Sequence, residues 1–248
     1  MIVRKSQAEL ATMREAGRLT ARALRAVGDA VAVGVTTGEL DEIAAEVIGR
    51  AGAKAAFKGY HGYPATICSS RNGEVVHGIP GRTKLVEGDI ISVDVGAIVD
   101  GYFGDSARTF AVGAVSDEAG RLLEYTEKSL EAGIARCHPG MRLYDIGAAV
   151  QAVAEAAGFS VVREYVGHGI GRAMHEEPQV PNYGTAGRGP TLLSGMVLAI
   201  EPMINAGGAA VRQLNDGWTV VTTDGSLSAH FEHTVAITDD GPVVLTIE

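Results

Sequence analysis

The sequence repeats part of itself at a nearly constant spacing. Residues between Gly34 and Gly52 match residues between Gly140 and Gly158 at an offset of 106 positions. At an offset of 107, the segment GDIISVD (88–94) aligns with GMVLAIE (195–201). Chance similarity of amphipathic patterns is the alternative, but a duplication explains the match better. We therefore expect a single domain over residues 1–248, built from two pseudo-symmetric halves of roughly 1–115 and 116–248.

Helices and strands are both predicted. A capping-box spacing, Ser or Thr followed three residues later by Glu, opens predicted helices over residues 6–27 and 36–52. Further helices are predicted near 117–136 and 143–157. Segments rich in β-branched or aromatic residues predict strands at 89–99, 102–112, 159–168, 196–204 and 230–238. The chain is therefore α+β or α/β.

Composition excludes several classes of protein. The chain is 46% hydrophobic and 21% charged, and it lacks an apolar run near 18 residues, so we expect a folded protein without a membrane span. Its first residues lack a signal-peptide pattern, which favours the cytoplasm. A formal charge of -9 argues against nucleic-acid binding as the main role. Cys68 and Cys137 match neither a disulfide scaffold nor a zinc knuckle.

Two carboxylates flank a predicted hairpin in the first half. Asp100 and Gly101 form a strong signal for a two-residue turn between strands. If they form that turn, Gly96 pairs with Asp105. Asp94 lies on the same side of its strand as Gly96, so the two acids become diagonal neighbours about 7 Å apart, close enough to bridge a metal. A three-residue loop would break this argument.

The second half offers two matching acids. The repeat aligns Glu201 with Asp94, and Glu232 lies 31 positions further on. Four acids converge if the halves face each other. Burial of unpaired carboxylates among apolar strand residues is unfavourable, so a cation must lie nearby. Arg108, another basic side chain and a bound metal are the candidates.

Histidines decide which metal would suit such a site. Oxygen ligands alone suit magnesium or calcium, whereas an added imidazole favours manganese, iron, cobalt, nickel or zinc. His168 lies between glycines in YVGHGIGRAMH (165–175), and His175 ends that segment. Taken alone, each histidine fits a structural hydrogen-bonding role better than a metal-binding one.

Other catalytic chemistries have weaker support. The sequence lacks the paired Asp-Ser/Thr-Gly turns of pepsin-like proteases, a phosphate-loop lysine, GxSxG and HExxH. A glycosidase needs only paired acids, but a chain whose only tryptophan is Trp218 offers little aromatic surface for stacking on sugars.

Motifs along almost the whole chain resemble those of the type I methionine aminopeptidases. They follow that family's order and nearly its spacing: KGYHGYP (58–64), HGIP (77–80), Asp94 with Asp105, YVGHGIGRAMH (165–175) with PNY (181–183), AIEP (199–202) and SAHFEH (228–233). The resemblance implies the α+β pita-bread fold, a curved antiparallel sheet in two pseudo-symmetric halves with helices on the outer face.

The resemblance also implies a dinuclear centre of divalent metal ions, with cobalt, manganese, iron, zinc and nickel as candidates. A hydroxide bridging the metals would attack the peptide bond, and Glu201 matches the general base. His175 matches the residue that stabilises the tetrahedral intermediate, and His77 matches one that contacts the substrate near its free amine. The implied ligands are Asp94, Asp105, His168, Glu201 and Glu232, with Asp105 and Glu232 as bridging carboxylates.

By the same resemblance, a methionine side chain would lie in a pocket lined by Tyr60, Tyr63, Cys68 and Trp218. Ordinary core packing is the alternative for each of these four. Phe57 stands where many members have Cys, and Met174 stands where an aromatic residue is common. Both departures concern the shape of the pocket rather than the reaction.

The implied activity is removal of the N-terminal methionine from nascent proteins, with a preference for a small second residue. A monomer is expected, with transient ribosome contact as a further expectation and with no membrane or nucleic-acid partner. Type II enzymes need a helical insertion for which the 31 positions from Glu201 to Glu232 leave no room. An X-Pro aminopeptidase or prolidase-like enzyme and a metal-free peptide-binding protein on the same scaffold are the alternatives. The full ligand set argues against the second.

Overall fold

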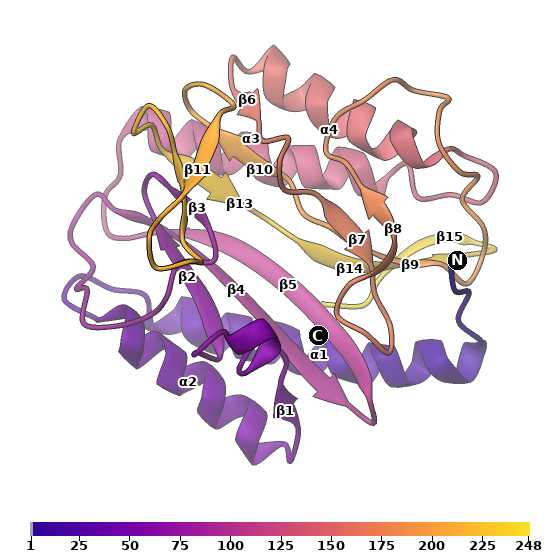
Figure 1. Ribbon diagram of the computed structural model, residues 1–248, viewed down its shortest axis with the longest axis horizontal. Coiled ribbons are helices and arrows are strands. Elements are labelled where there is room, and N and C mark those ends of the chain that lie inside the picture. The colour runs from indigo at the N-terminus through magenta and orange to yellow at the C-terminus, as the bar shows by residue number, and fades with distance from the viewer. Residues whose placement is uncertain (1) are drawn as a thin grey trace.

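Two helix pairs enclose the strands of the computed structural model, which describes residues 2–248 (Figure 1). One pair lies below the strands in this view and the other lies above them. The lower pair packs on the first-half strands, and the upper pair packs on the second half. The helices are α1 (Gln7–Ala30), α2 (Thr37–Arg50), α3 (Asp117–Ile134) and α4 (Leu143–Ala156).

The first two helices begin where their capping boxes predict. At the start of α1, the Ser6 N–H donates to Glu9 Oε2 at 2.8 Å, and the Glu9 N–H donates back to Ser6 Oγ at 3.4 Å. Thr36 and Glu39 repeat this arrangement before α2. Because these bonds satisfy backbone donors that a helix start leaves free, they fix both boundaries.

The strands form several antiparallel sheets. In the first half, β4 pairs with β1, β2 and β5, and in the second half the order is β15-β14-β9-β7-β8. Smaller sheets have the orders β13-β10-β6 and β11-β12-β3, and a short helix, η1 (Tyr60–Gly62), precedes β2. The first-half strands are β1 (Lys54–Ala55), β2 (Ile67–Arg71), β3 (Glu74–Val76), β4 (Ile90–Val99) and β5 (Tyr102–Ala111). The second-half strands are β6 (Ser160–Val161), β7 (Gly167–Gly169), β8 (Glu176–Val180), β9 (Val197–Ile200), β10 (Met203–Asn205), β11 (Val211–Gln213), β12 (Val220–Thr222), β13 (Ser228–His230), β14 (His233–Thr238) and β15 (Gly241–Val244).

The predicted hairpin is confirmed. Asp100 and Gly101 have φ values of 50° and 79°, so both lie in the left-handed region that a tight two-residue turn requires. Gly96 pairs with Asp105 across β4 and β5. Asp94 is therefore the diagonal neighbour of Asp105, as the alternation argument requires.

The three long strands predicted in the second half are wrong as continuous elements. Residues 159–168 divide into β6 and β7, 196–204 into β9 and β10, and 230–238 into β13 and β14. In the second case the break includes Pro202, which has no backbone N–H for a ladder bond. In the third case, the break includes Glu232, whose backbone N–H donates to Ala107 O of the first half at 2.8 Å.

Two structural features recur at matching positions in the two halves. An isolated bridge joins Thr36 to Lys84, and another joins Arg142 to Thr191 at nearly the same offset. The helices α2 and α4 both have 14 residues. A duplication predicts these features, and the boundary near residue 115 stays a prediction.

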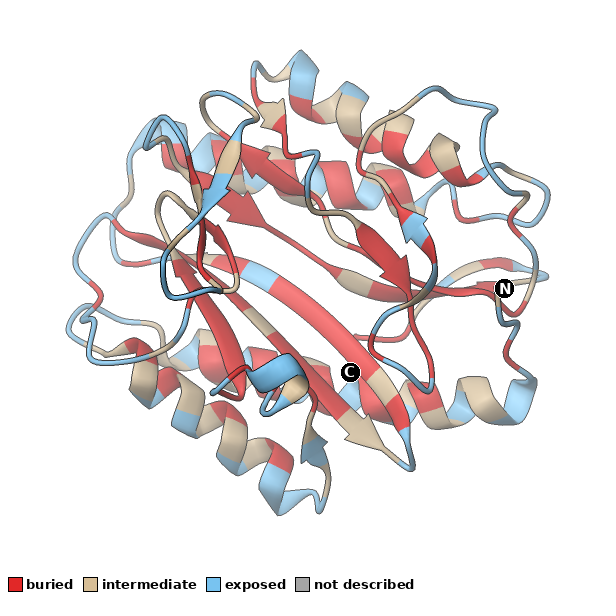
Figure 2. Ribbon diagram, in the orientation of Figure 1, coloured by how far each residue is buried: buried red, intermediate tan, exposed pale blue. Residues whose placement is uncertain are grey.

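The apolar core follows the same division. One buried cluster lies between α1, α2 and the β4–β5 hairpin, and a larger cluster lies between α3, α4 and the second-half strands. Figure 2 shows buried strands at the centre and exposed residues on the outward faces of the helices. Among residues 2–248, every helix is too short or too polar to cross a bilayer.

Candidate active site

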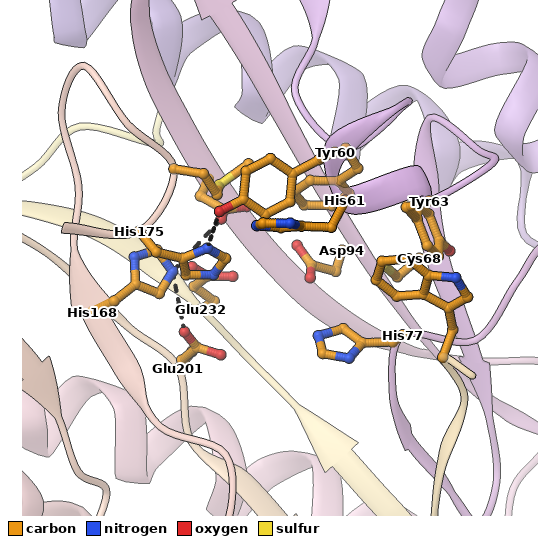
Figure 3. Close-up of a pocket in the computed structure, with 14 residues that line it drawn as sticks. Tyr60, His61, Tyr63, Cys68, His77, Asp94, His168, His175, Glu201 and Glu232 are labelled. Atoms are coloured by element: carbon orange, nitrogen blue, oxygen red, sulfur yellow. Dashed lines mark hydrogen bonds and ion pairs between the residues drawn. The ribbon is translucent and has the colours of Figure 1, made fainter. Parts of the chain in front are cut away.

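A cavity of about 260 Å³ collects the residues nominated from the sequence. All the expected metal ligands, catalytic groups and substrate-binding residues line it, together with Phe57, Met174 and His61. Figure 3 shows an acidic side with Glu201, Glu232 and His168, and an opposite side with Tyr63 and Cys68. The complete lining is Phe57, Tyr60, His61, Tyr63, Cys68, His77, Asp94, Asp105, His168, Met174, His175, Glu201, Trp218 and Glu232.

Acids from both halves meet an imidazole at the base of this cavity. Ligand atoms of Asp105, His168 and Glu232 lie within 4.8 Å of one another. His168 Nε2 also lies 3.5 Å from Glu201 Oε1. Asp94 completes the group from β4. The cluster has the donors of a divalent metal site.

Hydrogen bonds between the halves hold this cluster in place. Thr234 Oγ1 donates to Asp105 O at 2.8 Å and accepts from the Asp105 N–H at 3.1 Å. Ser106 Oγ donates to Glu232 O at 2.7 Å. These partners are 126 and 129 positions apart in sequence but are in contact in the folded protein. The site therefore forms only when the two halves assemble.

Within residues 2–248, three of the carboxylates each have a buried oxygen without a hydrogen-bond partner. Asp94 Oδ1, Asp105 Oδ1 and Glu232 Oε1 are buried without a hydrogen-bond partner. Burial raises the pKa of Asp105 to about 7. Burial, followed by repulsion from neighbouring carboxylates, raises the pKa of Glu232 well above its usual value.

Arg108 is not the compensating cation, which corrects one of the sequence interpretations. Its guanidinium is half-exposed and lies 3.2 Å from Glu127 on α3. Arg108 pairs with Val93 in the β4–β5 register, whereas Asp105 pairs with Gly96, so strand alternation turns them to opposite faces. The unpaired carboxylate oxygens therefore fit a divalent metal.

His168 has the protonation state that a metal ligand needs. Its Nδ1 lies 2.9 Å from Gly169 O, and burial, followed by the nearby His175, lowers its pKa to about 4. A neutral ring that donates its Nδ1 proton to this carbonyl turns the Nε2 lone pair toward the acids.

The opposite wall is apolar. Phe57, Tyr63, Cys68 and Met174 are all buried and pack in one cluster with Trp218. The Tyr63 hydroxyl donates to the carbonyls of residues 67 and 78, each at 2.9 Å, so its ring is held in place. The residues proposed as a methionine pocket therefore do surround one apolar space.

Histidines and a tyrosine form the rim. His175 Nδ1 lies 2.8 Å from Tyr60 Oη (Figure 3). His77 adopts a φ of 61°, a left-handed conformation uncommon for residues other than glycine. Burial, followed by the influence of His175, lowers the pKa of His77 to about 4, so its ring is neutral at pH 7.

Two histidines near the cavity were not nominated from the sequence. His61 lines the cavity beside Tyr60, with ring centroids 4.4 Å apart. His230 is 2% exposed, and its unpartnered Nε2 lies 3.8 Å from Glu201 Oε2. Strand alternation could have found His230, because it lies two positions before Glu232.

An acid and imidazole cluster beside an apolar pocket, on this scaffold, defines a metallopeptidase site. The chain belongs to metallopeptidase family M24, whose family model matches residues 11–239. Within that family it falls among the type I methionine aminopeptidases, and its activity is that of a methionyl aminopeptidase, a metal-dependent hydrolase.

Similar proteins support this assignment over the full length. The chain is 53% identical over 246 residues to methionine aminopeptidase 1 of Bacillus subtilis, covering 99% of both chains. It is 51% identical over 247 residues to the methionine aminopeptidase of Clostridium perfringens, covering 100% of this chain and 99% of the relative. The crystal structure of methionine aminopeptidase from Rickettsia prowazekii superposes with a TM-score of 0.98 at 44% identity, covering 100% of both chains. The expected α+β pita-bread fold is confirmed.

Proposed function

We propose that this protein removes N-terminal methionine from newly made polypeptides in the cytoplasm when the second residue is small. The observation that carries the proposal is one cavity with a buried acid and imidazole cluster on one side and an apolar pocket on the other. This pairing suits hydrolysis beside a bound apolar side chain better than X-Pro cleavage or peptide binding without metal.

We propose two divalent metal ions, because four carboxylates and one imidazole offer up to nine donor atoms, more than a single six-coordinate ion uses. When bound, the ions supply Lewis acidity, which polarises a carbonyl and lowers the pKa of water. Asp105 and Glu232 suit a bridging role because each half contributes one of them to the same buried cluster. The mixed oxygen and nitrogen donors suit cobalt, manganese, iron, zinc or nickel. The proposed ligands are Asp94, Asp105, His168, Glu201 and Glu232.

Glu201 is the proposed general base. Its side chain is 15% exposed, compared with 6% for Asp105, so it is the more open of the two to the cavity. Burial, followed by repulsion from Asp105, raises its pKa well above the usual value. A carboxylate that lies open to the cavity can take a proton from water and pass it to the departing amine.

His175 and His77 are proposed to contact the substrate. If the Tyr60 hydroxyl donates to His175 Nδ1, the ring carries its proton on Nε2, as a donor to developing negative charge requires. His77 lines the cavity beside Trp218, with ring centroids 6.5 Å apart. We propose that it contacts the substrate backbone near the free amine.

The apolar wall is proposed to select methionine. Cys68, Met174 and the aromatic rings are polarizable, which suits a thioether side chain. We propose a small second residue as the accompanying rule of selection. The family resemblance supports the same rule.

The test is release of free methionine from Met-Ala-Ser and Met-Leu-Ser by chelator-stripped protein with manganese or cobalt added back. We expect release from the first peptide only, and only with metal. If the metal-loaded protein releases methionine from neither peptide, the proposal is overturned, and X-Pro peptides would then be assayed. We further propose a monomer with at most transient ribosome contact, which sedimentation with and without ribosomes tests.

A further inference from the structure

Lys5 is a buried cation in the N-terminal arm, defined as residues 2–6, which runs past β9 and β15 to α1 (Figure 1). Its side chain is 3% exposed, and Nζ lies 2.7 Å from Glu176 Oε2. The Lys5 N–H donates to Gly195 O at 2.6 Å, and Arg4 Nε donates to Ser194 O at 2.6 Å. Because buried lysines need partners, the arm is fixed against the second half.

Glu176 joins the arm to a turn at the active site. Its second oxygen, Oε1, accepts from the N–H groups of Arg172 at 2.8 Å and Ala173 at 3.2 Å. These amides belong to the turn formed by residues 171–175. Bonds to an ionised carboxylate are stronger than neutral ones, so one ion pair holds two backbone amides of this turn.

The packing of the arm and the turn is close. A Cβ atom at Gly171 would lie 2.5 Å from Lys5 Cε and 2.6 Å from Glu176 Oε1. The Phe103 N–H donates to Gly171 O at 2.9 Å, which fixes the start of the turn against the β4–β5 hairpin. The turn is therefore held at its start by the hairpin and at its centre by Glu176.

The same turn carries two residues of the cavity. Met174 is 2% exposed and forms part of the apolar wall. His175 contacts Tyr60, and its ring centroid lies 4.3 Å from that of His168. A shift of about 1 Å in such groups can lower a reaction rate 100-fold.

We propose that Lys5 is a positioning residue that acts through Glu176 to hold His175 and Met174 in register with the metal cluster. The arm thereby completes the active site of the second half. The catalytic part of this inference rests on the proposed role of His175, whereas the mechanical part stands on the contacts alone.

The test compares Lys5→Met with Lys128→Met in the full-length, metal-loaded enzyme. Lys128 is a matched control, because it pairs with Glu124 at 2.5 Å on α3 but is 50% exposed. Hydrogen exchange of the peptide covering residues 171–175 reports on the turn, and kcat and KM for Met-Ala-Ser report on its catalytic role.

For Lys5→Met we expect local exchange about tenfold faster or more, because removal of one partner of a buried ion pair is strongly destabilising. We expect kcat to fall between about tenfold and 100-fold, with a smaller change in KM. Lys128→Met should change neither quantity.

The double variant Lys5→Met/Glu176→Gln covers the case in which Lys5→Met fails to fold, because it removes both charges together. It should unfold at a higher temperature than Lys5→Met, yet its turn should still exchange faster than in the wild type, because a neutral amide oxygen accepts more weakly.

Unchanged exchange in the turn of both variants would overturn the proposal. An equal rise in exchange over the whole chain would also overturn it, since Lys5 would then be only a stabilising residue. Faster exchange with unchanged kcat would overturn the catalytic part. Inactivity of the wild type would count against the proposed function and would leave the exchange result interpretable.

Discussion

The two halves place their acids differently with respect to their strands. Asp94 and Asp105 lie inside β4 and β5, where the ladder continues on both sides. Glu201 follows the last residue of β9, and Glu232 precedes the first residue of β14. The first half thus presents acids from a continuous hairpin, and the second half presents them where strands break.

This difference concerns how the backbone of each half holds its acids. Residues within a ladder have backbone groups committed to neighbouring strands. Glu232 instead uses its N–H to reach Ala107 in the other half. The hairpin ladder therefore holds Asp94 and Asp105 within one half, whereas a contact between the halves holds Glu232.

The largest expected effect compares the two acids that the repeat aligns. Glu201→Gln should lower kcat by about 10²–10⁴-fold, the usual contribution of a general base, and excess metal should not restore it. Asp94→Asn should weaken metal binding and regain activity as metal is added. Rates measured across a metal titration distinguish the two, with exposed Glu124→Gln as the control. Equal recovery of activity in both variants would show that Glu201 and Asp94 do not differ in role.

The next prediction concerns stability of the chelator-stripped protein. Burial raises the pKa of Asp105 from 3.8 to about 7, so the folded state binds more protons than the unfolded state between these values. Stability from this group is present below pH 3.8 and is lost as pH rises toward 7. Bound metal requires deprotonated ligands, so the gap between melting temperatures of loaded and stripped protein should widen with pH. Parallel curves would contradict the metal assignment.

A smaller effect is expected at the joint between the halves, defined as the contact between Thr234 and Asp105. Thr234→Val leaves the buried backbone N–H and C=O of Asp105 without the hydroxyl that serves both. The free energy of unfolding should fall by about 1–3 kcal/mol. Thr126→Val is the control, because that buried hydroxyl bonds only to Leu122 O within its own helix. Urea unfolding of both variants measures the difference, and equal losses would show that the joint has no special role.

The smallest effect is expected in the hairpin turn. Gly101→Ala introduces a side chain at a φ of 79°, which should lower stability by about 1 kcal/mol. Gly49→Ala, in α2 with open space around it, should raise stability by about 0.5–1 kcal/mol. Thermal unfolding measures whether each variant is less or more stable than the wild type. A stabilising Gly101→Ala would mean that the turn does not set the register of the acids.

Features that depend on neighbouring residues could be predicted from the amino-acid sequence. Capping boxes set the helix starts, and Asp100 with Gly101 set a hairpin register that places Asp94 diagonal to Asp105. These signals act over a few positions, because they depend on local dihedral preferences and on the alternation of side chains. The motifs of the family resemblance carried the rest of the nominated site.

Three features became visible only in the folded protein: the breaks in the second-half strands, the orientation of Arg108 away from the acids, and the pairing of Lys5 with Glu176. Each of these features depends on contacts between segments far apart in the chain and on burial, which no local pattern specifies. An acid acquires its environment only when the two halves close around it.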